Sequence, residues 1–152
     1  MIKRLLLILS LVFLVSFSLN AQNVKQPAVA LIPYPVTLVE GEGAFVFTEK
    51  TVVALEDKEM EAIARDFIGL FTKAAGFTPK LKVNSKKGDV RLMKDDSLQE
   101  EEYALEVTSE KILMRAAGVK GAFYALQTLR QLLPSAIESN EYKADVVWKV
   151  PA

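Results

Sequence analysis

The segment from residue 112 to residue 134 constrains the fold most, because it predicts a strand, a sharp turn and a helix in direct succession. Apolar and polar residues alternate over residues 112–116, which is the period of a half-buried strand. Gly118 and Gly121 allow the backbone to turn from the strand into the helix. Apolar residues then recur every three or four positions from Val119 to Leu133, and a proline ends the predicted helix. The chain is therefore expected to pack helices on a sheet.

A second helix is predicted over Lys58 to Ala75. Asp57 precedes it, and its carboxylate can accept hydrogen bonds from the free amides of the first turn. One apolar stripe follows the helical period and comprises Met60, Ile63, Ala64, Phe67, Phe71 and Ala74. Gly76 suits the left-handed position beyond the last turn, and Pro79 prevents continuation of the helix.

Short apolar or alternating runs predict further strands. They lie at residues 29–32, which form an edge strand or an extended entry, and at residues 36–39, 44–47, 51–55, 80–83, 89–93 and 103–107. The loop Glu40 to Gly43 predicts a hairpin between the second and third of these runs, and the short connection Thr108 to Lys111 predicts another hairpin before residues 112–116. The predicted fold class is α+β, a mainly antiparallel sheet of about six or seven strands with two helices packed on one face.

The N-terminus has the layout of a signal peptide. Lys3 and Arg4 precede an uncharged run over residues 5–19, and a short polar segment with Ala21 follows. A retained membrane anchor is the alternative, but the run is shorter than the ~20 apolar residues that span a bilayer. We predict a signal peptide over residues 1–21, export to the periplasm or the extracellular space, and no membrane contact after cleavage.

Charge and composition exclude several classes of site. The chain has 19 basic and 19 acidic residues, and loss of two basic residues with the leader leaves a formal net charge of −2, which does not recruit nucleic acid. The chain has no histidine and no cysteine. Imidazole acid–base chemistry, thiol nucleophiles, disulfides and zinc–thiolate sites are therefore excluded. No cofactor and no metal are expected.

Two acidic runs, Asp95–Asp96 and Glu100–Glu102, are candidates for a pair of acid and base carboxylates. Both lie in the most polar part of the chain, with no apolar wall to raise the pKa of one member and keep its proton at neutral pH. We interpret them as solvated loop residues. No catalytic residue is predicted.

The last helix places Phe123, Tyr124, Gln127 and Arg130 beside its main apolar stripe and partly outside it. In one interpretation the rings complete the local core while the polar side chains face water. In the other, this flank docks onto a larger partner domain and Arg130 pairs with a carboxylate there, a role that suits a guanidinium. The same alternatives apply to Trp148, for which interdomain packing is favoured because it lies in the segment that leaves the domain.

Three segments of the chain carry a resemblance to a known family. They are Ile32–Pro35 together with residues 41–47, then residues 103–116, then residues 121–133. In this order and spacing they resemble the N-terminal domain that precedes the catalytic barrel in β-N-acetylhexosaminidases of glycoside hydrolase family 20. Residues 148–152 resemble the start of that barrel.

The resemblance divides the mature chain into a hexosaminidase-like N-terminal α/β domain at residues 22–144 and the start of a linker, at residues 145–152, to a catalytic barrel that the chain lacks. In the family, the substrate's acetamido oxygen attacks the anomeric carbon, a Glu protonates the leaving oxygen and an Asp orients the acetamide. Both acidic residues belong to the barrel. The resemblance therefore implies a domain that is inactive alone, with the barrel of the same polypeptide as its partner and glycan contact only through the parent enzyme.

Two alternatives remain open at this point. The chain could be the accessory domain of another glycan hydrolase, such as an α-glucuronidase, because related domains precede other barrels. It could also be a free-standing exported interaction module with no enzyme attached, since fold alone does not determine function.

Overall fold

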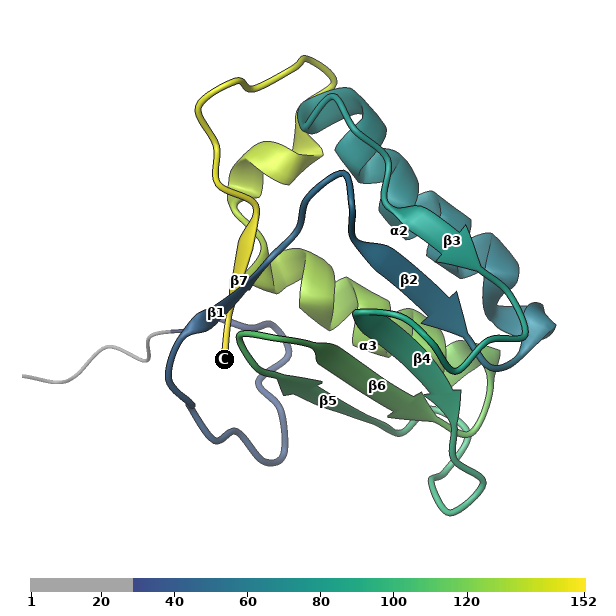
Figure 1. Ribbon diagram of the computed structural model, residues 1–152. Coiled ribbons are helices and arrows are strands. Elements are labelled where there is room, and N and C mark those ends of the chain that lie inside the picture. Colours follow the sequence, from purple (N-terminus) through teal and green to yellow (C-terminus); the bar gives the residue numbers. More distant parts are fainter. Residues whose placement is uncertain (1–28) are drawn as a thin grey trace, which may run out of the picture.

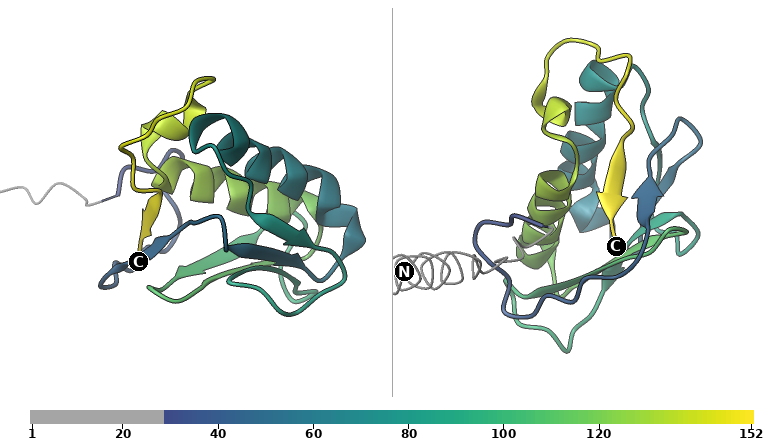
Figure 2. Two further views of the ribbon diagram at one scale, coloured as in Figure 1. Left: turned by 45° about the horizontal axis from the view of Figure 1, so that its top comes forward. Right: turned by 90° about the vertical axis from the view of Figure 1, so that its left-hand side faces the viewer.

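The computed structural model describes residues 29–152, and the predicted signal peptide lies outside them (Figure 1). The elements follow in the order β1 (Ala44–Val46), β2 (Val52–Leu55), the 3-10 helix η1 (Lys58–Met60), α2 (Glu61–Ala74), β3 (Lys80–Lys82), β4 (Val90–Lys94), β5 (Tyr103–Val107), β6 (Ile112–Ala116), α3 (Val119–Leu132), the 3-10 helix η2 (Ser135–Glu138) and β7 (Lys149–Pro151). Both long helices cover the same face of the main sheet (Figure 2). The α+β class and the two helices on one face are as predicted.

The main sheet has five strands in the order β3-β2-β4-β6-β5. The pairs β2–β3, β2–β4 and β4–β6 are parallel, and only β5–β6 is antiparallel. The prediction of a mainly antiparallel sheet is therefore wrong for this sheet. Alternation of apolar residues reports which face of a strand is buried, but not its direction. The helix α2 carries the chain back across the sheet between β2 and β3, and a crossover of this kind makes its two strands parallel.

A second, two-stranded sheet joins the two ends of the described chain. In it β1 pairs antiparallel with β7, with Phe45 opposite Val150. The predicted hairpin between residues 36–39 and 44–47 is wrong, because residues 36–39 form no strand and β1 takes its partner from the C-terminal end. Residues 29–32 form no strand either. The hairpin of β5 and β6 is confirmed.

The ends of the helices follow the local signals in the sequence. The Asp57 carboxylate accepts a hydrogen bond from the backbone amide of Glu59 at 2.9 Å, which caps η1 and the α2 helix that continues it. Beyond α2, Gly76 has a φ of +72°, the left-handed conformation that glycine adopts without strain. Among residues 29–152 no helix has both the length and the apolarity needed to cross a membrane.

The core lies between the two helices and the main sheet, and Phe71 of α2 is fully buried in it. Its ring lies within 4.7 to 6.2 Å, centroid to centroid, of four other aromatic rings, those of Phe47, Phe67, Phe77 and Trp148. Burying each such side chain stabilises the fold by roughly 1.5–3 kcal/mol. The chain has no cysteine, so no disulfide contributes to stability. Apolar packing is therefore a main source of stability for the fold.

Gly121 sets the distance between α3 and the loop that precedes β5. A Cβ placed on Gly121 would lie 2.3 Å from the carbonyl oxygen of Glu102 and 3.2 Å from the Cβ of Ala116. The backbone amide of Gly121 also donates to the carbonyl of Glu100 at 3.1 Å. Only glycine permits this close approach.

We expect Gly121→Ala to lower the free energy of unfolding by about 1–3 kcal/mol, because the new methyl group must displace backbone. Gly69 provides the matched control, since it also lies in a long helix but a Cβ there would meet nothing within 4 Å. Gly69→Ala is expected to stabilise the chain by roughly 0.5–1 kcal/mol through helix propensity. Urea unfolding followed by circular dichroism measures both changes, and equal effects of the two substitutions would contradict the close packing at Gly121.

Candidate functional site

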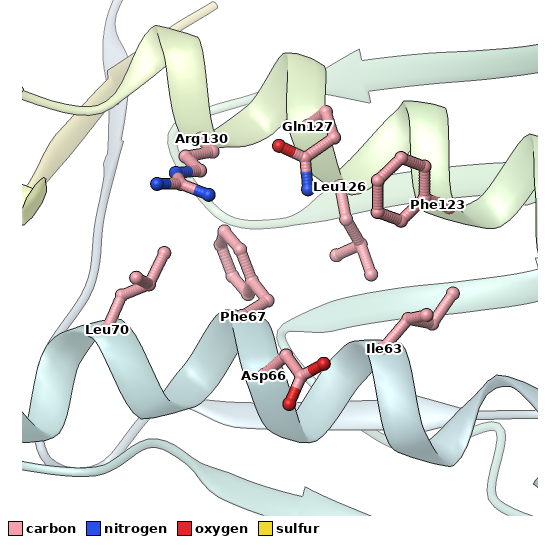
Figure 3. A pocket seen from close by; sticks show the side chains of 8 residues that line it. All are labelled: Ile63, Asp66, Phe67, Leu70, Phe123, Leu126, Gln127 and Arg130. Carbon is pink, nitrogen blue, oxygen red and sulfur yellow. The ribbon is translucent and has the colours of Figure 1, made fainter.

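A groove runs between α2 and α3 on the side of the helices that faces away from the sheet, and it encloses a pocket of about 330 Å³ (Figure 3). Four residues of α2 line it: Ile63, Asp66, Phe67 and Leu70. Four residues of α3 line the other side: Phe123, Leu126, Gln127 and Arg130. We refer to these eight residues as the helix groove.

Helical spacing explains why these side chains meet. Residues that are three, four or seven positions apart share one face of a helix, so Ile63, Asp66 and Leu70 project from α2 along one line. Phe123, Gln127 and Arg130 do the same on α3. The floor of the groove is apolar, with Phe67 and Leu126 buried, and its rim combines the exposed ring of Phe123 with polar side chains. Surfaces that bind another protein segment often have such an apolar centre with polar groups around it.

The structure brings three of the five predicted docking residues together in the groove: Phe123, Gln127 and Arg130. Phe123 and Tyr124 each keep 43% of their surface exposed, and their rings meet edge to face at 5.7 Å. Tyr124 does not line the pocket but extends the aromatic surface beside it. The prediction that these residues contact a separate domain stays a prediction.

The α2 half of the groove was missed from the sequence. Ile63 and Phe67 belong to the apolar stripe predicted to face the core, and Asp66 lies outside that stripe. The apolar surface of α2 is wider than one stripe, since Leu70 extends it on one flank. This additional apolar residue is the feature of the sequence from which the α2 half of the groove could have been predicted. Among residues 29–152, Asp66 has no ion-pair partner, so the groove rim holds one unpaired carboxylate.

Arg130 already has a carboxylate partner inside the domain. Its Nε donates to Oε1 of Glu138 at 2.6 Å, and its Nη2 donates to Oε2 of the same residue. These hydrogen bonds raise the pKa of Arg130 and lower the pKa of Glu138. The pair fixes the guanidinium between α3 and η2, which differs from the predicted pairing of Arg130 with a carboxylate of another domain.

Trp148 lies in the core and not on the surface. Only 5% of it is exposed, and its ring meets that of Phe71 edge to face at 6.2 Å. Its carbonyl accepts a hydrogen bond from the amide of Phe47 at 2.8 Å. The residue therefore packs within this domain, and the segment around it, expected to start a linker, continues into strand β7.

The acidic run at residues 95–96 has the character of a surface turn. The Asp95 carboxylate accepts hydrogen bonds from the hydroxyl and the amide of Ser97, at 2.5 and 3.1 Å, and these bonds lower its pKa, with a smaller contribution from the charge of Arg115. A lowered pKa favours the charged carboxylate, the opposite of what a general acid needs. Within residues 29–152 no group of three His, Cys, Asp or Glu side chains is arranged to hold a metal ion.

The position of Trp148 in the core leads to a stability prediction. We expect Trp148→Ala to destabilise the 152-residue chain by about 3–5 kcal/mol, because it removes a buried aromatic side chain. Its neighbour Val147 is 61% exposed, so Val147→Ala is expected to change stability by no more than about 0.5 kcal/mol. Urea denaturation measures both. If Trp148→Ala changed stability as little as Val147→Ala does, the burial of Trp148 in the core would be contradicted.

The Arg130–Glu138 pair leads to a prediction on pH. A carboxyl whose pKa is lowered on folding stabilises the fold above its unfolded pKa, and this contribution is lost as the pH falls through the folded pKa. The ordinary value for glutamate is 4.5. Glu138→Gln should therefore cost less than about 1 kcal/mol at pH 7, since half of the side chain is exposed, and the difference should shrink below pH 4.5.

Thermal unfolding at a series of pH values measures this difference. Glu110→Gln is the control, because that exposed side chain has no ion-pair partner within residues 29–152. The thermal stability of Glu110→Gln should differ little from that of the unsubstituted chain at every pH. A stability difference for Glu138→Gln that stays constant down to pH 3 would show that the pair contributes nothing through charge.

Comparison with known proteins identifies the family. Residues 28–151 match the family described as glycosyl hydrolase family 20, domain 2. Over 138 residues the chain is 28% identical to a Beta-hexosaminidase of Porphyromonas gingivalis, covering 86% of this chain but only 18% of that relative. The chain thus spans less than a fifth of the curated relative that it matches.

Solved structures share the fold. A mutant β-hexosaminidase of Streptomyces plicatus in complex with product (GlcNAc) superimposes with a TM-score of 0.74 at 25% identity, covering 84% of this chain and 26% of that chain. The β-N-acetylhexosaminidase of Bacteroides fragilis has a TM-score of 0.59 at 24% identity, covering 80% of this chain and 23% of that chain. The family match over nearly the whole described chain shows that the protein belongs to glycosyl hydrolase family 20 and contains its domain 2.

Proposed function

We propose that this domain is a non-catalytic part of an exported β-N-acetylhexosaminidase, in which it docks against the catalytic barrel of the same polypeptide and supports it. The family assignment over residues 28–151 is the observation that carries the proposal. It favours a hexosaminidase parent over the α-glucuronidase alternative. The relative from P. gingivalis, a Beta-hexosaminidase of which this chain spans 18%, supports a longer polypeptide.

The helix groove supplies the docking surface in this proposal. Phe123 is nearly half exposed beside a pocket with a mixed apolar and polar lining, and aromatic side chains that fill pockets contribute much of the energy of protein interfaces. Asp66 gives the rim a negative charge that a lysine or arginine of the partner can pair with. Arg130, held by Glu138, contributes its flat apolar face and its remaining donors to the partner instead of a new ion pair.

Hydrolysis of terminal N-acetylhexosamine in the parent enzyme would take place in the barrel. The acid that protonates the leaving oxygen and the aspartate that orients the acetamide belong there, so no residue of this chain is assigned a catalytic role. The signal-peptide layout of residues 1–21 supports delivery to the periplasm or beyond. The contribution of the domain is then stability and positioning of the barrel.

A single substitution studied in two contexts tests the proposal. In the 152-residue chain, Phe123→Ser is expected to change the free energy of unfolding by less than about 1 kcal/mol, because the ring is partly exposed. In the longer polypeptide from the same gene, the same change should cost at least about 1–2 kcal/mol more, because it also removes an interface anchor. Urea unfolding measures the difference between the two contexts.

Turnover of an aryl N-acetyl-β-glucosaminide provides the second measurement. The longer polypeptide should hydrolyse it, and the 152-residue chain should not. Phe123→Ser should lower the stability of the longer polypeptide and leave its KM unchanged. An altered KM with unaltered stability would instead indicate direct sugar contact, and a longer polypeptide without turnover would leave the free-standing interaction module as the better description.

A further inference from the structure

A second apolar surface lies outside the helix groove, in the loop that precedes β1. Four large apolar side chains within residues 32–39 remain exposed: Ile32 at 82%, Tyr34 at 63%, Val36 at 107% and Val39 at 83%. We refer to residues 32–39 as the apolar loop. Isolated apolar residues at a surface are ordinary, but a concentration of them in one short segment marks an interaction site.

Hydrogen bonds hold the apolar loop in place at both ends. The amide of Ile32 donates to Oε1 of Gln131, and Nε2 of Gln131 donates back to the carbonyl of Ile32, each at 3.0 Å. Just past the other end of the loop, the amide of Gly41 donates to the carbonyl of Ala152 at 3.0 Å. Pro33 and Pro35 restrict the backbone between these anchors. Ordering of this kind reduces the entropy lost on binding.

The same anchors place the apolar loop beside the point where the chain leaves the domain. The amide of Ala152 donates to the carbonyl of Gly43 at 3.1 Å, which completes a reciprocal contact with residues 41–43. A Cβ on Gly41 would lie 3.3 Å from the carbonyl carbon of Ala152, so the two backbones touch. In Figure 1 the C-terminus and the loop lie at the same end of the domain, away from the tips of β2 and β3.

We propose that the apolar loop is the contact surface for the polypeptide that follows Ala152 in the hexosaminidase, separate from the helix groove. The inference rests on the proposed function. A segment that starts at Ala152 leaves beside the loop, and the relative has more than four fifths of its length outside the matched domain. Covalent linkage gives such a segment an effective concentration on the order of millimolar, which favours it over a second copy of the chain.

Burial of a single engineered cysteine tests this inference, since the chain has no cysteine of its own. Val36→Cys is introduced into the 152-residue chain and into the longer polypeptide, and maleimide labelling is followed by peptide mass spectrometry. Labelling in the longer polypeptide should be at least about tenfold slower, because it then requires local separation of the two surfaces. Lys86→Cys is the control, because Lys86 is exposed in the turn between β3 and β4, and it should label equally in both.

The outcomes distinguish the inference from the function on which it rests. Equal labelling of Val36→Cys in a longer polypeptide that hydrolyses the aryl N-acetyl-β-glucosaminide overturns the inference alone. Protection that already occurs in the 152-residue chain, and rises with its concentration or with added lipid vesicles, assigns the loop to a second copy or to a membrane and also overturns it. A longer polypeptide without turnover overturns the proposed function and the inference with it.

A second measurement avoids any effect of the substitution on docking. Tyr34 is 63% exposed, so its ring is accessible to hydroxyl radicals in the unsubstituted chain. Its oxidation should fall in the longer polypeptide, while oxidation of Tyr142, which is 64% exposed, should not. Equal oxidation of Tyr34 in the two contexts counts against the inference in the same way as unprotected Val36→Cys.

Discussion

Packing of the two long helices against one face of the main sheet is the interaction on which the rest of the structure depends. It buries the apolar faces of α2 and α3, and Phe71 of α2 also packs among four other rings, three of which come from segments outside the helices and the main sheet. The helix groove exists because both helices are held at a fixed separation by this shared core. A rigid surface of this kind suits the role proposed for the domain, the support of a catalytic barrel.

Features that depend on neighbours in the sequence could be predicted well. The cap at Asp57, the left-handed turn at Gly76 and the apolar stripes of both helices are local signals, and the structure confirms each of them. The hairpin of β5 and β6 could also be predicted, because a short connection between two alternating runs restricts how they can pair.

Features that join distant segments could not be predicted in this way. The direction of β2, β3 and β4 depends on crossovers, and the pairing of β1 with β7 joins the two ends of the described chain. The α3 half of the groove could be identified from residues outside one stripe, whereas the α2 half depends on how the helices lie on the sheet. Trp148 was misplaced for the same reason, since its core partner Phe71 is distant in the sequence.

The pairing of β1 with β7 also affects the order of events during synthesis. Strand β1 leaves the ribosome early, but its hydrogen-bonding partner is the last strand of the domain. Contacts between distant segments form slowly, because the intervening chain must first be ordered. The growing polypeptide therefore cannot complete this domain until residues 149–151 have emerged from the ribosome, and until then the pairing edge of β1 stays open.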